Sequence, residues 1–156
     1  MAPPFTIRTD DLTSPAVLAL LREHLAAAAA HSPPGCVHAL DVGALRGGDV
    51  TFWSVWREGD LAGIGALKEL DPIHGELKSM RTAREHLRQG VAATLVTHML
   101  EVAKARGYRR VSLETGSHEP FAAARALYER FGFVRCAPFA AYADNGFSVC
   151  MTRVLD

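Results

Sequence analysis

The sequence predicts a mixed α/β fold, a single domain over residues 1–156 whose sheet carries helices on both faces. The chain is long enough for one domain with a sizeable core. Strand and helix patterns alternate along it instead of forming separate blocks. A strand at 75–82, a helix at 89–106 and a strand at 109–115 form a β-α-β crossover. This pair of strands is therefore expected to be parallel.

The chain begins with a short strand and a long helix. Apolar and polar residues alternate over Phe5–Arg8, which is typical of a strand. Ser14 and Pro15 are favourable capping and first-turn residues, and the helix is expected to run to about His31. The pattern over Cys36–Leu45 is ambiguous, and we interpret residues 37–40 as a short helix.

A β-hairpin follows. Val50–Arg57 is dense in β-forming residues, 58–60 supplies a turn, and Leu61–Leu70 returns as an antiparallel strand. Gly63 and Gly65 lie two residues apart and so share one face of that strand. Either another group passes close to this backbone, or the strand is twisted or bulged there.

The strand at 75–82 has no clean polar and apolar faces, which is expected where one face lines a site. Strict alternation places Glu76, Lys78 and Met80 on one face and Leu77, Ser79 and Arg81 on the other. The helix at 89–106 has the clearest apolar periodicity in the chain. The remaining elements are expected to be strands at 109–115, 133–136 and 147–154 and a helix at 118–131.

Composition excludes several classes of function. Basic and acidic residues number 17 each, so the net charge of zero argues against a broad nucleic-acid surface. No apolar run reaches the ~18 residues that a membrane span needs, and no signal-peptide pattern is present. Three separated cysteines favour a reducing compartment, so we expect a cytoplasmic protein. No metal-binding spacing of Cys or His residues occurs, and no metal is predicted.

The segment Leu87–Ala92 joins the strand at 75–82 to the long helix. Backbone N–H groups in such a loop, the helix dipole and the charge of Arg88 together form the physical basis for binding phosphate. Small residues at Gly90 and Ala92 would let a pyrophosphate approach the backbone. The alternative is an ordinary connection between a strand and a helix.

Two motifs resemble the GNAT superfamily of N-acetyltransferases, particularly its small bacterial members. The family loop reads Gln/Arg-x-x-Gly-x-Gly/Ala, and Leu87-Arg-Gln-Gly-Val-Ala92 keeps its glycine and final small residue. Leu87 stands where Gln or Arg is usual, so contacts to the pyrophosphate would come from backbone N–H groups, Arg88 and Gln89. Ala126–Phe133 is similar to the family's Leu-Tyr-x-x-Gly-Phe helix ending. The predicted element order matches the family over nearly the whole chain.

This resemblance implies an enzyme that moves an acetyl group from acetyl-CoA directly to an amine of a small molecule, without a covalent enzyme intermediate. It implies a mostly antiparallel sheet in which the parallel strands 76–82 and 109–115 splay apart around the pantetheine arm. A backbone N–H near Met80 would polarise the thioester carbonyl. The cofactor contacts that it implies are Met80, Arg81, Thr82, Arg88, Gln89, Gly90, Val91, Ala92, Ala93 and Ala124.

The same resemblance implies two catalytic residues. Tyr128 would be the general acid, because a phenol with a pKa of about 10 is matched to a thiolate leaving group. Otherwise Tyr128 is a helix residue packed beside its neighbours. Glu76 would be the general base, with Glu114 or a chain of waters as rivals. Otherwise Glu76 is an exposed strand carboxylate or a partner for Lys78.

A catalytically silent acyl-CoA-binding or sensing module on the same fold is the alternative function. The acceptor would be set by the N-terminal helices, the 50–70 hairpin and the C-terminal loop, which carry no motif. Trp53 is favoured as a residue of the core or the sheet face, and Trp53 and Tyr142 are also the aromatic candidates for lining an acceptor pocket. A hydrophobic sheet edge at Phe147–Met151 would allow a homodimer.

Overall fold

The computed structural model describes residues 4–30, 42–117, 119–140, 142 and 146–155. Its described strands form a seven-stranded sheet in the order β1-β2-β3-β4-β5-β7-β6, in which only the β4–β5 pair is parallel. The mostly antiparallel mixed sheet is therefore confirmed. The strands are β1 (Thr6–Thr9), β2 (Val50–Arg57), β3 (Asp60–Asp71), β4 (His74–Thr82), β5 (Arg110–Gly116), β6 (Val134–Cys136) and β7 (Ser148–Val154).

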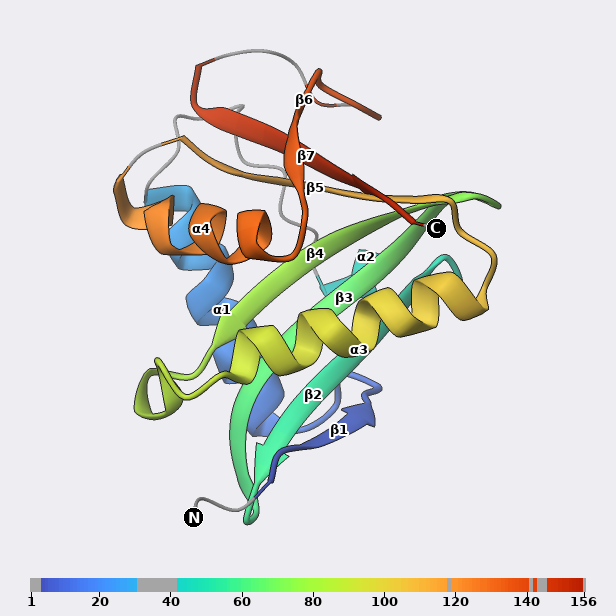
Figure 1. Ribbon diagram of the computed structural model, residues 1–156. Coiled ribbons are helices and arrows are strands. Elements are labelled where there is room, and N and C mark those ends of the chain that lie inside the picture. Colours follow the sequence, from blue (N-terminus) through green and yellow to red (C-terminus); the bar gives the residue numbers. More distant parts are fainter. Residues whose placement is uncertain (1–3, 31–41, 118, 141, 143–145, 156) are drawn as a thin grey trace.

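Helices cover both faces of this sheet, as predicted: α1 and α2 lie on one side, and α3 and α4 on the other (Figure 1). Ser14 caps α1, since its Oγ accepts a hydrogen bond of 3.2 Å from the Val17 N–H. The helices are α1 (Pro15–Ala30), α2 (Val42–Leu45), α3 (Val91–Ala105) and α4 (Ala122–Arg130), with 3₁₀ turns at Arg84–His86 and Glu119–Phe121. None of the described helices is long and apolar enough to cross a membrane.

Most helix boundaries lie within a few residues of the predicted ones, and the departures have local causes. The helix expected at 118–131 starts later, because a 3₁₀ turn containing Pro120 precedes α4. The helix expected at 89–106 begins at Val91, because Gly90 adopts a left-handed conformation (φ 85°). The predicted helix at 37–40 lies outside the described residues.

Each face of the sheet has its own apolar core. The core under α3 and α4 includes Leu77, Leu95, Met99, Val111, Leu113, Tyr128 and Phe133. The core under α1 and α2 includes Leu12, Val17, Leu21, Leu45, Phe52 and Ile64. Each fully buried leucine or valine side chain contributes about 1.5–3 kcal/mol to the stability of the fold, so apolar packing holds a helical layer against each face of the sheet.

Close packing explains the paired glycines of β3. A Cβ atom on Gly63 would lie 2.7 Å from Val91 Cγ1, and one on Gly65 would lie 2.6 Å from Met80 Sδ. Leu95 of α3 would be equally close to the second Cβ atom, at 2.7 Å. Of the two sequence-based interpretations, close approach by another element is therefore correct, and a bulge opposite Gly65 accompanies it.

The parallel pair separates partway along its length. β4 and β5 pair from His74↔Arg110 to Leu77↔Leu113, after which both strands continue without pairing to each other. Figure 1 shows β4 and β5 diverging beyond this point. The splayed parallel pair is therefore confirmed, and residues 78–82 and 114–116 form its two arms.

A bulge interrupts β4 where the separation begins. Ile64 of β3 pairs with Arg81, and Ala66, two residues later, pairs with Lys78. Two residues of β4 therefore oppose the single Gly65. Such an insertion shifts the side-chain alternation of the bulged strand by one residue.

This shift makes the predicted faces of β4 wrong beyond Lys78. Ser79 takes a positive φ of 57°. Met80 then faces α3, where its Sδ atom lies against the backbone of Gly65. Arg81 faces α1 instead and forms a 3.8 Å ion pair with Glu23. Strict alternation predicted the opposite face for both residues, because nothing in the sequence marks the bulge.

The predicted hydrophobic edge at Phe147–Met151 is also wrong. Strand β7 pairs with β5 on one side and β6 on the other, so it lies inside the sheet. Val149, Cys150 and Met151 are buried. The sheet edges of the described residues are β1 and β6.

Candidate active site

The loop before α3 ends in backbone N–H groups that have no partner within the helix. The N–H groups of residues 91–93 begin the helix and have no partners within it. Gly90 is required here by its positive φ rather than by crowding, since a Cβ atom on it would meet nothing within 4 Å. This is an anion-binding arrangement.

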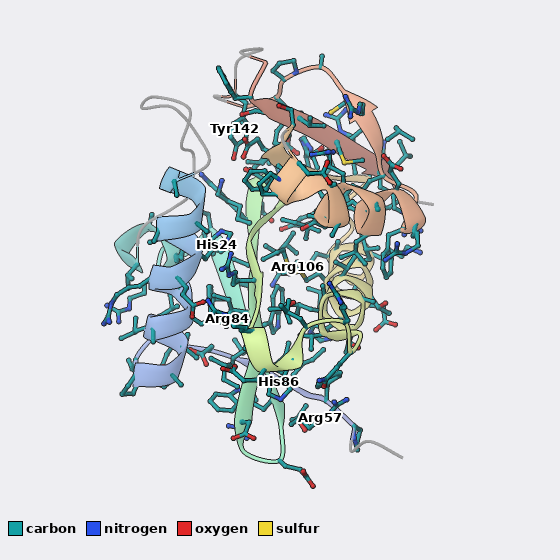
Figure 2. The ribbon with its side chains drawn as sticks, turned by 90° about the vertical axis from the view of Figure 1, so that its left-hand side faces the viewer. His24, Arg57, Arg84, His86, Arg106 and Tyr142 are labelled. Carbon is teal, nitrogen blue, oxygen red and sulfur yellow. The ribbon has the colours of Figure 1, made fainter. Side chains whose placement is uncertain are left out.

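The two polar side chains of this loop are used differently. Gln89 Oε1 accepts a 2.8 Å hydrogen bond from Arg57 Nη1, and its amide donates to the Glu85 carbonyl at 3.3 Å. Gln89 therefore braces the loop against β2. Arg88 is exposed, and no hydrogen bond or ion pair is found for it within the described ranges. Figure 2 shows Arg57 and His86 near this loop.

Glu76 lies at the point where the parallel strands separate, with its side chain only 3% exposed. Its Oε2 atom accepts hydrogen bonds from Lys78 Nζ at 3.1 Å and from the Tyr142 hydroxyl at 2.5 Å. Lys78 Nζ also donates to the Tyr142 oxygen at 2.7 Å. The three side chains therefore form a closed, partly buried triangle. An exposed strand carboxylate is excluded, and the predicted pairing with Lys78 is confirmed.

Neighbouring polar groups extend this cluster across the sheet. His74 Nε2 and Ser112 Oγ are 2.7 Å apart, and Ser112 Oγ lies 2.8 Å from Thr152 Oγ1. The ring of Phe139 stands between His74 and Tyr142, with centroid distances of 5.9 Å and 5.1 Å. Burial is the main cause that lowers the pKa of His74, and the nearby charge of Arg110 adds to it, so this imidazole is neutral at pH 7.

Tyr128 lies on the opposite side of the sheet from Glu76. It is buried under α4, and its ring packs edge-on against Phe133 at a centroid distance of 5.8 Å. Burial raises the pKa of the phenol well above its usual value, so the hydroxyl keeps its proton at neutral pH. This environment agrees with both sequence-based interpretations of Tyr128, as a packed helix residue and as a general acid, because burial also keeps the hydroxyl protonated.

Glu114, the rival base, lies on the same side of the sheet as Glu76. On β5, Val111 and Leu113 belong to the core under α3, so the alternating Ser112 and Glu114 face the other way. Burial, followed by the negative charge of Glu76 and then of Glu114, raises the pKa of Tyr142. The tyrosine is therefore a hydrogen-bond donor between two carboxylates.

His24 and Arg81 continue this side of the sheet toward α1. Figure 2 shows His24 and Tyr142 on the α1 side of β4. Burial, with the charge of Arg81 as a second cause, lowers the pKa of His24 to about 4. The imidazole is therefore neutral at physiological pH.

Trp53 is buried in the core on the α3 side, edge-on to His98 at 5.4 Å, so the core position that the sequence favours for it is confirmed. Sequence reasoning missed the role of two other residues. Tyr142 lies 66 residues from Glu76 in the chain, and no local pattern links them. His24 lies on a predicted helix, and no sequence pattern indicates that burial lowers the pKa of its imidazole. Among the residues that the structure describes, no group of three potential ligands is placed to hold a metal ion.

Comparisons with known proteins agree with this geometry. Residues 17–133 match the model of the acetyltransferase (GNAT) family. The chain is 54% identical to the uncharacterized N-acetyltransferase YsnE of Bacillus subtilis, covering 96% of this chain and 99% of that protein. It is 56% identical to the uncharacterized N-acetyltransferase YedL of Escherichia coli, covering 88% and 87%.

A solved structure agrees in fold. The GNAT family acetyltransferase from Elizabethkingia anophelis, crystallised with acetyl-CoA bound, superposes with a TM-score of 0.71. The match is 18% identical and covers 97% of this chain and 98% of that one. With a family match over most of its length and two close relatives, the chain belongs to the GNAT family and is an acyltransferase.

Proposed function

We propose that this chain, as a single domain, transfers the acetyl group of acetyl-CoA to the amine of a small molecule by direct attack. The observation that carries the proposal is the splayed pair of β4 and β5 beside the N–H groups that begin α3. The acetyl-CoA bound to the Elizabethkingia anophelis protein of the same fold supports this choice of donor.

The splay leaves backbone groups that a pantetheine arm would satisfy. Beyond Leu77, the described residues of β4 no longer pair with β5, and a backbone N–H or C=O group that lacks a partner is strongly driven to find one. Met80 and Thr82 would pair with the pantetheine amides. The diphosphate would bind the loop backbone and Arg88, with contacts along Gln89, Gly90, Val91, Ala92 and Ala93. Arg81 would contact the cofactor through its backbone alone, because its side chain faces α1, and Ala124 of α4 would line the opposite wall.

Acid and base would act from opposite sides of the sheet. The acceptor would approach from the α1 side as a neutral amine that has released its ammonium proton to solvent, and Glu76 would take a proton from the nitrogen as it attacks, through Oε1, directly or through a water molecule. The nitrogen forms a bond to the thioester carbon, and a backbone N–H near Met80 stabilises the resulting oxyanion. The carbon–sulfur bond then breaks, and Tyr128 protonates the departing CoA thiolate from the α4 side.

The triangle around Glu76 fits the role of a positioned base. Both hydrogen bonds described for its carboxylate end on Oε2, so Oε1 is the oxygen available to a substrate proton. Lys78 also places a positive charge 3.1 Å from the buried carboxylate. Glu114 remains the rival base on the second arm of the splay, separable from Glu76 by mutation.

The test measures release of free CoA thiol with a panel of small amines, together with thermal stabilisation by acetyl-CoA. We expect stabilisation by acetyl-CoA and acetylation of at least one amine. Glu76→Gln should lower kcat by about 10²–10⁴-fold, and Glu114→Gln should leave kcat nearly unchanged. Stabilisation without any acetylated amine would favour the silent binding module instead. The absence of stabilisation would reject both functions.

A further inference from the structure

The bulge in β4 places a second basic residue of this strand, Arg81, on the α1 side of the sheet. Without it, Arg81 would alternate onto the α3 side. With it, Glu76, Lys78 and Arg81 follow one another along the same side of the strand. Arg81 lies on the part of β4 that no longer pairs with β5, next to the proposed position of the thioester.

The two basic side chains on this strand differ in their freedom to bind a ligand. Lys78 is only 8% exposed and is held by Glu76 and Tyr142. Arg81 is 33% exposed, and its described contact is a 3.8 Å ion pair with a half-exposed glutamate, Glu23. That separation is longer than a hydrogen bond, and exposed pairs of this kind contribute little. A ligand carboxylate can therefore replace Glu23 at small cost.

The neighbourhood of Arg81 favours one anionic partner. His24 is neutral at physiological pH, so it adds no second cation that would attract a more highly charged group such as a phosphate. Its imidazole can still donate one hydrogen bond. At the other end of the face lie the carboxylates of Glu76 and Glu114, with Lys78 paired to Glu76 and Lys68 of β3 opposite it.

We propose that the acceptor is a zwitterionic amino-acid-like molecule whose carboxylate binds the guanidinium of Arg81 and whose amine points to Glu76. The planar fork of arginine matches a carboxylate in two parallel hydrogen bonds. After the bulge, four steps of ~3.3 Å separate the two residues along the strand, or roughly 13 Å between α-carbons. Two long side chains and a compact amino acid fill that span.

This inference rests on the proposed acetyltransferase function and names its substrate class. The test compares free amino acids with their carboxamides, which keep the amine and the side chain but lose the charge. For the wild-type protein, kcat/KM should favour the acids by about 10- to 100-fold, the range expected for hydrogen bonds to a charged group. Arg81→Gln should remove this preference by raising KM for the acids alone, while Arg81→Lys should restore part of it.

Two controls separate this role from others. Arg22→Gln, on the exposed surface of α1 beside Glu23, should leave the preference unchanged. KM for acetyl-CoA should also be unchanged in Arg81→Gln. A rise in that constant would instead assign the Arg81 side chain to the cofactor and overturn the inference.

The outcomes distinguish failure of the inference from failure of the proposed function. Equal acetylation of acids and amides by the wild-type protein overturns only the substrate class. An equal loss for acids and amides in Arg81→Gln overturns it as well. If no amine of either series is acetylated, the proposed function fails and the inference fails with it.

Discussion

Tyr142 joins the C-terminal loop to the buried carboxylate of Glu76. The carboxylate is held by a lysine on its own strand and by a tyrosine from a distant loop. Removal of either partner would leave a buried charge less well satisfied, which costs more than an exposed hydrogen bond would. The orientation of Glu76 therefore depends on both strand and loop.

The first prediction concerns this tyrosine. Tyr142→Phe removes the hydroxyl but keeps the ring that packs against Phe139. We expect kcat to fall by about tenfold, because one charged hydrogen bond of ~1.5–3 kcal/mol that orients Glu76 is lost. Affinity for acetyl-CoA should not change. Tyr108→Phe is the matched control, since Tyr108 donates to Glu69 away from the site. Equal effects from both variants would contradict a positioning role.

The second prediction concerns Tyr128. Tyr128→Phe should lower kcat by about 10²–10³-fold and leave acetyl-CoA binding intact, because only the proton donor is removed. Because burial raises the pKa of this phenol, the wild-type acid stays protonated up to and beyond pH 10, and kcat should show no alkaline loss below that pH. Steady-state kinetics across pH 6–10 measure both. An unchanged kcat in the variant would mean that Tyr128 only packs.

At the scale of elements, α1 carries a histidine whose burial makes stability depend on pH. The pKa of His24 is lowered to about 4 from 6.5, so the unfolded chain binds a proton between these values and the folded chain does not. The contribution of His24 to the free energy of unfolding is therefore fully present above pH 6.5 and is lost as the pH falls toward 4. The loss amounts to ~3 kcal/mol at most.

The third prediction follows from that histidine. Urea unfolding at pH 7.5 and at pH 4.5 should show a loss of stability on acidification in the wild-type protein. His24→Gln should show a clearly smaller loss between the same two pH values, because glutamine does not titrate. A variant that loses stability to the same extent as the wild-type protein would show that other groups are responsible.

The fourth prediction tests how α3 packs on β3. Gly65→Ala inserts a methyl group within 3 Å of Met80, Leu95 and Met99, so overpacking should lower the free energy of unfolding by about 1–3 kcal/mol. Gly48→Ala is the control, because a Cβ atom there meets nothing within 4 Å. Denaturant unfolding compares the two. Equal stability of both variants would contradict the close approach of the helix.

At the scale of the whole molecule, periodicity and turn residues were sufficient to predict the order of elements and the parallel pair. The crossover from β4 through α3 to β5 is visible because the helix is strongly amphipathic and is bounded by Gly90 and Gly107. The resemblance of two motifs then identified the family. These signals are local, and a single sequence displays them directly.

The remaining features depend on contacts between distant parts of the chain. The bulge lies at Ser79, a residue with no particular preference for positive φ, so the sequence does not show which side of the sheet Arg81 faces. The placement of β7 between β5 and β6 removed the expected sheet edge. The contact between Tyr142 and Glu76 joins two residues that lie 66 positions apart in the chain. In each case tertiary packing, rather than local propensity, decides the outcome.

In the proposed function, the gap between the two arms of the splay holds acetyl-CoA with its reactive end between Glu76 and Tyr128. A crystal structure with CoA bound would show this arrangement. We expect the diphosphate on the N–H groups of residues 88–93, pantetheine between 78–82 and 114–116, and the sulfur reachable from Tyr128 on one side and from Glu76 on the other. CoA bound elsewhere, or a sulfur turned away from both side chains, would contradict it.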